Sequence, residues 1–186
     1  MKTFFKGFCI GLLSLSLLGL LWFLVLQPGL TNKEAQDLKE EYAQPLPGES
    51  SGELPAGKEQ AASLVNLSAL QAEYPDIQGW ISIPGTCVDY PVLQSSADEP
   101  EYYLRRTYKG EHRTAGSIFF QWDCSPESRN LVVYGHNMSD GTMFAVLQKM
   151  ADEAFRTEHS KILLQTSDGL WEYRIAAVLK TDITKL

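Results

Sequence analysis

The sequence predicts a mostly-β domain, a closed or nearly closed barrel with short inserted helices. From Pro75 onward, short apolar segments follow one another at close spacing, which is typical of short strands. Turn-forming pairs such as Pro84-Gly85 separate these segments. Only residues 142–150 interrupt them with helical spacing, and short strands around one helix favour a barrel. Because Leu186 follows directly after a long strand, we expect the barrel of this polypeptide to be incomplete.

The N-terminus predicts a membrane anchor. Residues 1–7 carry Lys2 and Lys6 and no acid, and residues 8–26 hold no charge at all. A helix of that length spans roughly 28 Å, close to the hydrocarbon core of a bilayer. Lysines before the segment and acids after it predict a single-pass protein of the cell membrane, with a cytoplasmic tail (1–7), a transmembrane helix (8–27) and an extracellular domain. A cleaved signal peptide is the alternative, but small residues are missing from the place of a cut.

Residues 28–58 are predicted to form a stalk or linker. Residues 32–44 are charged and helix-prone, with Ala35, Leu38 and Tyr42 at helical spacing. Residues 45–58 contain three prolines and three glycines, a composition that cannot bury a core. The barrel domain is therefore expected to occupy residues 59–186.

The elements of this domain follow in order. Helical periodicity over 59–74 ends at Pro75, and the strands expected after it are 80–83, 88–93, 117–121, 130–134, 162–164 and 171–179. Pro91 predicts that the second strand is an edge strand or carries a bulge. The unbroken apolar run of 131–134 favours a strand buried on both faces. In the helix at 142–150, Met143, Phe144 and Leu147 are expected to face inward.

Charge and cysteine content exclude several classes of function. The net charge is −7 and no basic stripe occurs, so nucleic acid is excluded as a partner. No Cys-x-x-Cys or His-x-x-x-His spacing occurs, so no metal and no cofactor are predicted. Cys9 lies in the anchor, and Cys87 and Cys124 remain as candidates for a single disulfide, which the sequence leaves open.

His136 is the candidate catalytic residue. It follows a strand that ends at Gly135 and precedes a turn rich in Asn, Ser, Asp and Gly, in which Asp140 is placed to cap the next helix. A rigid strand end beside a loop is a suitable place for a general acid or base. By position alone a structural histidine is the commoner case. His112 and His159 are interpreted as surface and helix-end histidines, and Asn137 is a possible orienting residue for His136.

Six segments follow one another in order and at sensible spacing: YPDIQGWISIPGT (74–86), VDYPVLQ (88–94), EYYL (101–104), GSIF (116–119), YGHNM (134–138) and DGTMF (140–144). Together they resemble the sortases, and class B in particular. The resemblance runs from Tyr74 to the C-terminus. The resemblance identifies His136 with the catalytic histidine of the family.

The resemblance implies a transpeptidase on a β-barrel at the surface of a Gram-positive cell. Such an enzyme cleaves a sorting signal after its threonine and transfers the acyl group to a cell-wall peptide amine or a pilin lysine. A cysteine thiolate attacks the threonine carbonyl, a histidine transfers the proton that the leaving amine needs, and an arginine stabilises the oxyanion or holds the substrate.

The sequence departs from this pattern in two of the three groups. In sortases the cysteine ends a strand downstream of the histidine, and the arginine follows on the next strand. Cys87, Cys124 and all six arginines between Arg105 and Arg174 precede the family positions. The expectation is therefore a class B sortase truncated before its nucleophile and inactive alone, as a truncated gene or an incomplete gene model. The alternatives are a non-catalytic surface-binding module on a degenerate barrel, and an unrelated anchored hydrolase that uses His136.

Overall fold

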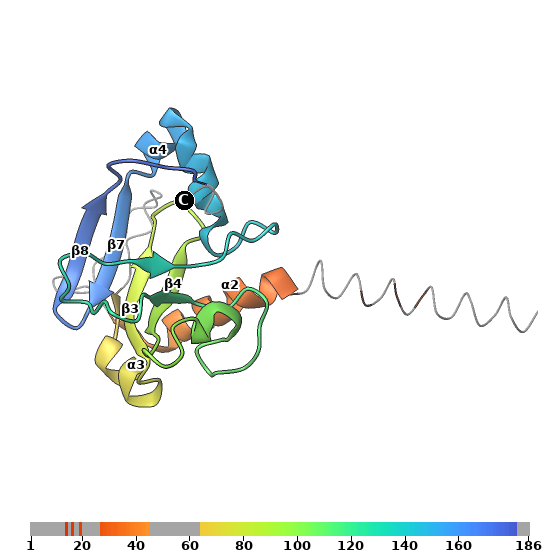
Figure 1. Ribbon diagram of the computed structural model, residues 1–186, viewed down its shortest axis with the longest axis vertical. Helices are drawn as coiled ribbons and strands as arrows, with labels where there is room; N and C mark the ends of the chain where they lie inside the picture. The colour runs from red at the N-terminus through yellow and green to blue at the C-terminus, as the bar shows by residue number, and fades with distance from the viewer. Residues whose placement is uncertain (1–13, 15, 17–18, 20–26, 45–63, 182–186) are drawn as a thin grey trace, which may run out of the picture.

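The computed structural model describes residues 14, 16, 19, 27–44 and 64–181 (Figure 1). The predicted transmembrane helix and the Pro- and Gly-rich part of the stalk lie outside these ranges, apart from single positions. Within the described ranges, no helix combines the length and apolarity needed to cross a bilayer.

Short strands and short helices alternate along the described chain, as expected for a mostly-β domain with inserted helices. The helices are α2 (Gln27–Glu41), α3 (Leu67–Glu73) and α4 (Glu153–Glu158), with 3₁₀ helices η2 (Tyr102–Arg105) and η3 (Phe144–Ala151). The strands are β1 (Ala43–Gln44), β2 (Leu64–Val65), β3 (Ile77–Ser82), β4 (Asp89–Gln94), β5 (Ile118–Phe120), β6 (Val133–Tyr134), β7 (Lys161–Thr166) and β8 (Gly169–Arg174). The helix expected over 59–74 is confined, in its described part, to α3, because Asn66 caps it by accepting a hydrogen bond from Ala69 N.

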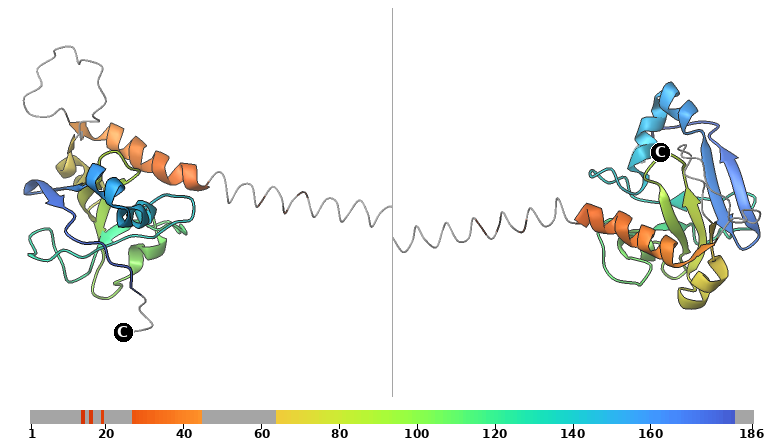
Figure 2. Two further views of the ribbon diagram at one scale, coloured as in Figure 1. Left: turned by 90° about the horizontal axis from the view of Figure 1, so that it is seen from above. Right: turned by 180° about the vertical axis from the view of Figure 1, so that it is seen from behind.

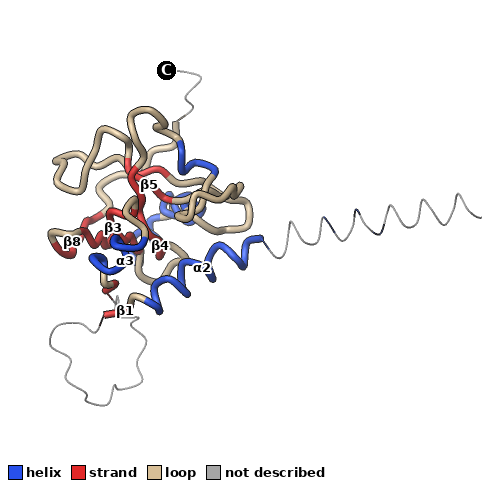
Figure 3. The backbone as a smooth tube through the Cα atoms, turned by 90° about the horizontal axis from the view of Figure 1, so that it is seen from below, coloured by secondary structure: helices blue, strands red, loops and turns tan. Residues whose placement is uncertain are grey.

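Six of the strands form one curled sheet in the order β6-β5-β4-β3-β7-β8 (Figures 1 and 3). Neighbours pair antiparallel except β4 and β5, which are parallel and are joined by the segment that contains η2. The turn at Pro84-Gly85 is confirmed, and Gly85 adopts a positive φ of 76° there. Among the described strands, β6 and β8 are the two edges of the sheet, so the barrel is not closed by these residues.

Pro91 does not mark an edge strand, which corrects the sequence prediction. It lies in β4, between β3 and β5. Ile83 N donates to Val88 O, and because hydrogen-bonded pairs alternate, Pro91 falls in a non-bonded pair opposite Trp80. On the other side, pairing with β5 begins only at Val92. The missing N–H of Pro91 therefore costs no ladder hydrogen bond, and the register shift of this pair lies on β3, between Ile77 and Gly79.

The strand before His136 is shorter and more exposed than predicted. Only Val133 and Tyr134 form β6, Val133 is half-buried, and Tyr134 is 44% exposed. β6 pairs with β5 alone among the described strands, so its outer edge is unpaired there. The prediction of a strand buried on both faces was wrong at this point.

The helix that follows the histidine is a 3₁₀ helix, η3, rather than an α-helix. Met143 is buried as predicted, but Val146 and Met150 complete its inner face, and Phe144 and Leu147 are half-buried. Asp140 does not cap η3, because its carboxylate accepts hydrogen bonds from the backbone N and the hydroxyl of Thr142 and so closes the preceding turn.

The C-terminal strand is also shorter than its alternating pattern suggested. β8 ends at Arg174, and all six of its residues are exposed, including Trp171 at 50%. In the described chain, β8 pairs only with β7 and forms an edge of the sheet. Trp171 is therefore not a core residue, whereas Trp80 and Tyr103 are buried.

The charged helix of the predicted stalk packs against the sheet (Figure 2). Ala35 and Leu38 of α2 are buried, as their helical spacing suggested. Lys39 Nζ contacts both carboxylate oxygens of Asp89 at 2.7 and 2.9 Å, and Asp89 also accepts from the indole N–H of Trp80 at 2.7 Å. α2 is thus held to β4 by apolar burial and by an ion pair together.

Candidate active site

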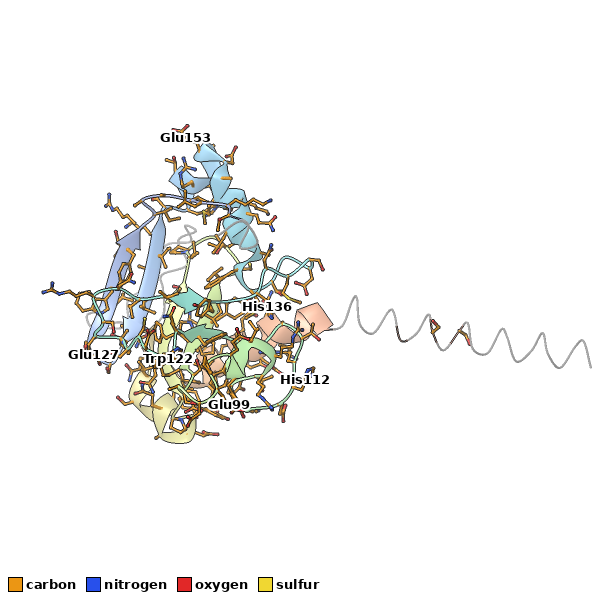
Figure 4. All side chains as sticks on the ribbon, in the orientation of Figure 1. Glu99, His112, Trp122, Glu127, His136 and Glu153 are labelled. Carbon is orange, nitrogen blue, oxygen red and sulfur yellow. The ribbon has the colours of Figure 1, made fainter. Side chains whose placement is uncertain are left out.

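His136 lies where the chain leaves β6 for the loop 137–143, and Figure 4 labels it at the base of that loop. Its ring is half-buried, and its Nε2 is 2.9 Å from the carbonyl oxygen of Leu104. A carbonyl oxygen only accepts, so Nε2 is the donor. In the neutral imidazole, Nδ1 is then the nitrogen with a free lone pair, and it is the atom able to take up or release a proton.

The carbonyl that holds His136 is itself fixed by a tight turn. Leu104 belongs to η2, and its N–H donates to Glu101 O. The backbone of Gly116 packs directly against the Leu104 carbonyl. The approach is so close that a Cβ at position 116 would lie 2.2 Å from Leu104 O. Gly116 adopts a φ of 58°, which a glycine tolerates without strain. The close approach of two backbones thus sets where the acceptor of His136 lies.

The residue before His136 is a glycine for a packing reason. A Cβ on Gly135 would lie 2.6 Å from the ring of Phe144. Phe144 N in turn donates to the carbonyl of His136 at 2.9 Å, and Asn137 forms an antiparallel bridge with Met143. The two ends of the loop are therefore paired, and this pairing fixes the backbone at His136.

The second half of the loop is hydrogen-bonded to β4 and to the turn before that strand. Met143 N donates to the Tyr90 hydroxyl at 3.2 Å, and Cys87 Sγ donates to Gly141 O at 3.1 Å. Gly141 N bonds back to Met138 O. These contacts hold the loop to residues more than fifty positions earlier in the chain.

A hollow of about 340 Å³ lies on the side of the sheet edge formed by β5 and β6, and residues close to His136 in the structure or the sequence line it. Leu104, which holds the histidine, and Tyr134, two residues before it, both line this hollow. Trp122 and Tyr134 are 47% and 44% exposed and supply broad apolar faces. The remaining lining residues are Pro100, Glu101, Phe119 and Gln121. An extended peptide segment can lie against such an apolar surface.

A larger hollow of about 560 Å³ lies between α2 and the turn that joins β3 to β4. Its lining comes from residues 32–43 and 82–90, and none of it from β6 or from the loop 137–143. The smaller hollow is therefore the candidate site, because it shares residues with the surroundings of His136.

The other sequence candidates lie as follows. Asn137 is exposed and pairs through its backbone, so its orienting role stays a prediction. Cys87 and Cys124 are free thiols, so the possible disulfide is not formed. His112 is exposed, and His159 packs on Phe155 at the end of α4, with Nδ1 at 3.0 Å from Pro84 O. In the described ranges, no cluster of His, Cys, Asp and Glu could hold a metal ion.

Cys87 is expected to react slowly, because burial raises the pKa of its thiol. The reactive form of cysteine is the thiolate, which is scarce at neutral pH when that pKa is raised. We expect iodoacetamide at pH 7.5 to modify Cys87 in the folded chain roughly tenfold or more slowly than in the urea-unfolded chain. Peptide mass spectrometry measures both rates of modification. The Cys87→Ser variant, which lacks this thiol, shows which modified peptide belongs to Cys87. Equal rates in the folded and unfolded chains would show that burial does not protect the Cys87 thiol. Cys87 would then be a candidate nucleophile.

Comparison with known proteins identifies the family. The sequence profile of the sortase domain matches residues 81–186. The chain belongs to the sortase family. Sortase B of Listeria monocytogenes is 40% identical to it over 117 residues, which cover 62% of this chain and 47% of that protein. This sortase therefore spans about half the length of the curated relatives that it matches.

Solved structures place this sortase in class B. Sortase B from Bacillus anthracis in complex with AAEK1 is 30% identical, with a TM-score of 0.62 over 87% of this chain and 74% of that one. The Staphylococcus aureus sortase B–substrate complex is 33% identical, with a TM-score of 0.54 over 57% and 50% of the two chains.

Sequence reasoning found the histidine but missed the residues that position it. Gly116 belongs to the quoted segment GSIF, and Leu104 ends the segment EYYL, yet no local pattern indicates that their backbones touch. Tyr90 was interpreted only as a strand residue. A glycine directly before a short strand was the one available signal of a close backbone approach.

Proposed function

We propose that this polypeptide is the N-terminal part of a membrane-anchored class B sortase. The enzyme would cleave the sorting signal of a surface protein after its threonine. It would then join that surface protein to a cell-wall peptide amine or a pilin lysine. Its domain would lie outside the cell, anchored by residues 8–27. The observation that carries the proposal is the imidazole of His136, held through Nε2 by the carbonyl of Leu104, a residue that also lines a hollow of about 340 Å³.

In this proposal His136 is the general acid and base. With Nε2 engaged by Leu104 O, Nδ1 would give its proton to the amide nitrogen that leaves the threonine carbonyl. The same atom would later take a proton from the attacking amine. The thiolate and the guanidinium would come from strands that follow the described chain, since Cys87 donates to a backbone carbonyl and Cys124 lies in the loop after β5.

The hollow lined by Leu104 and Tyr134 supports a peptide as substrate. Its aromatic and aliphatic lining offers apolar contact, and its one carboxylate, that of Glu101, offers a polar contact at the rim. The substrate complex of the related S. aureus enzyme supports the same class of ligand.

The test is a chimera. The segment of Listeria monocytogenes sortase B that follows its matched region is fused after Leu186, and threonine-containing sorting-signal peptides are offered with hydroxylamine as the amine. We expect hydroxamate product from the chimera and no thioacyl adduct from the original chain alone. His136→Ala in the chimera should lower kcat/KM by roughly 10²–10⁴, whereas Asn137→Ala should lower it far less.

Two outcomes would contradict the proposal. A chimera that is folded by circular dichroism but yields no product would favour the alternative, a non-catalytic module that binds peptides on the exposed faces of Trp122 and Tyr134. A thioacyl adduct on Cys87 or Cys124 of the original chain would show that the nucleophile is already present.

A further inference from the structure

The hydroxyl of Tyr90 connects helix α2 to the loop behind His136. Tyr90 is buried in β4, donates to Asn32 Oδ1 at 2.5 Å and accepts from Met143 N at 3.2 Å. One oxygen therefore serves as donor to the helix and as acceptor for the loop. Burial also raises the pKa of Tyr90 to about 12, so the hydroxyl keeps its proton at neutral pH.

Met143 is the residue of the loop that most needs an external partner. It has φ 55° and ψ −128°, a conformation that non-glycine residues rarely adopt, and its side chain is only 1% exposed. Such backbone persists where the surroundings hold it in place. Met143 bridges Asn137, and the next residue donates to His136 O, so a displacement of Met143 is passed directly to His136.

Two ion pairs, both on the C-terminal side of Asn32, hold α2 to the rest of the domain. Glu34 pairs with Arg113 at 2.5 Å, and Lys39 pairs with Asp89. Between these ion pairs, Ala35 and Leu38 are buried in the core. Asn32 is consequently presented to Tyr90 by a helix that cannot rotate without breaking two ion pairs.

We propose that Tyr90, oriented by Asn32 of α2, is a positioning residue for the loop that carries His136. The link to catalysis rests on the proposed function of His136, whereas the link between helix and loop does not. Through Asn32 and Tyr90, the position of α2 on the sheet is coupled to the position of the catalytic base. α2 is also the helix that follows the predicted anchor in the sequence.

The test is hydrogen exchange of the full chain in detergent micelles, followed by mass spectrometry of peptides that cover residues 136–144. Tyr90→Phe removes one acceptor for Met143 N, and the exchange of Met143 and Phe144 should rise about three- to tenfold. Asn32→Ala should give a smaller rise of about twofold, and Asn32→Asp, which keeps the acceptor oxygen, should restore the exchange of the unmodified chain.

Thr166→Val is the control. Thr166 is also buried, and its hydroxyl also accepts from a backbone N–H, that of Asp168 in the turn between β7 and β8. We expect faster exchange at Asp168 with no change at 136–144. The proposal is overturned if Tyr90→Phe leaves exchange at 136–144 unchanged, or if Thr166→Val raises it equally. Because exchange needs no turnover, an inactive chimera would count against the proposed function and leave this result standing.

Discussion

Replacement of Gly116 by alanine is expected to destabilise the domain by roughly 3–5 kcal/mol. The new Cβ would lie 2.2 Å from Leu104 O and 2.7 Å from Tyr103 O, and both atoms belong to the backbone. Backbone atoms cannot move aside as a side-chain end can, so η2 itself must shift. The positive φ of Gly116 adds a further cost, since L-residues with a side chain disfavour it.

This substitution should also disturb the candidate site. Leu104 O accepts from His136, so a shift of η2 lengthens that hydrogen bond or turns the ring. The measurements are urea unfolding of the full chain in micelles and the ring-proton resonances of His136 near neutral pH. We expect a lower unfolding midpoint together with displaced His136 resonances.

Gly141→Ala is the matched control for this prediction. Gly141 also has a positive φ, of 85°, but no heavy atom lies within 4 Å of a Cβ built on it. Only the backbone cost remains, about 1 kcal/mol. If Gly116→Ala and Gly141→Ala cost the same, the close approach at Leu104 is not what makes Gly116 necessary.

At position 143, we expect the glycine variant to be more stable than the alanine variant, which is the reverse of the usual order. Met143→Ala removes a fully buried side chain from the core and should cost about 2–4 kcal/mol. Met143→Gly removes the same side chain but also relieves the strain of a φ of 55°. We therefore expect the glycine variant to be more stable than the alanine variant by about 1 kcal/mol.

Met150 provides the comparison within the same core cluster. It is also 1% exposed, but it lies in η3, and Met143 alone among the described non-glycine residues has a positive φ. At Met150, glycine should be less stable than alanine by about 1 kcal/mol, the ordinary order. Chemical unfolding of the four variants decides the matter, and the same order at both positions would show that Met143 is not strained.

Local patterns in the sequence were sufficient for several parts of this protein. The Pro84-Gly85 turn, the inner face of α2 and the place of His136 between a strand and a turn all follow from neighbouring residues. The set of segments around Tyr134–Met138 was enough to indicate class B sortases, which the profile match and the solved structures confirm. Local patterns also misled, since Pro91 lies in an interior strand, where the pairing of its neighbours spares its missing N–H.

The sequence by itself determined the family, the mostly-β class and the identity of the candidate base. Only the tertiary structure decided how that base is held, through Leu104 O thirty-two residues away, and how α2 reaches it, through Tyr90 fifty-eight residues from Asn32. The physical reason is that a backbone carbonyl or a buried hydroxyl becomes a partner through packing, and packing brings together residues that no local periodicity relates.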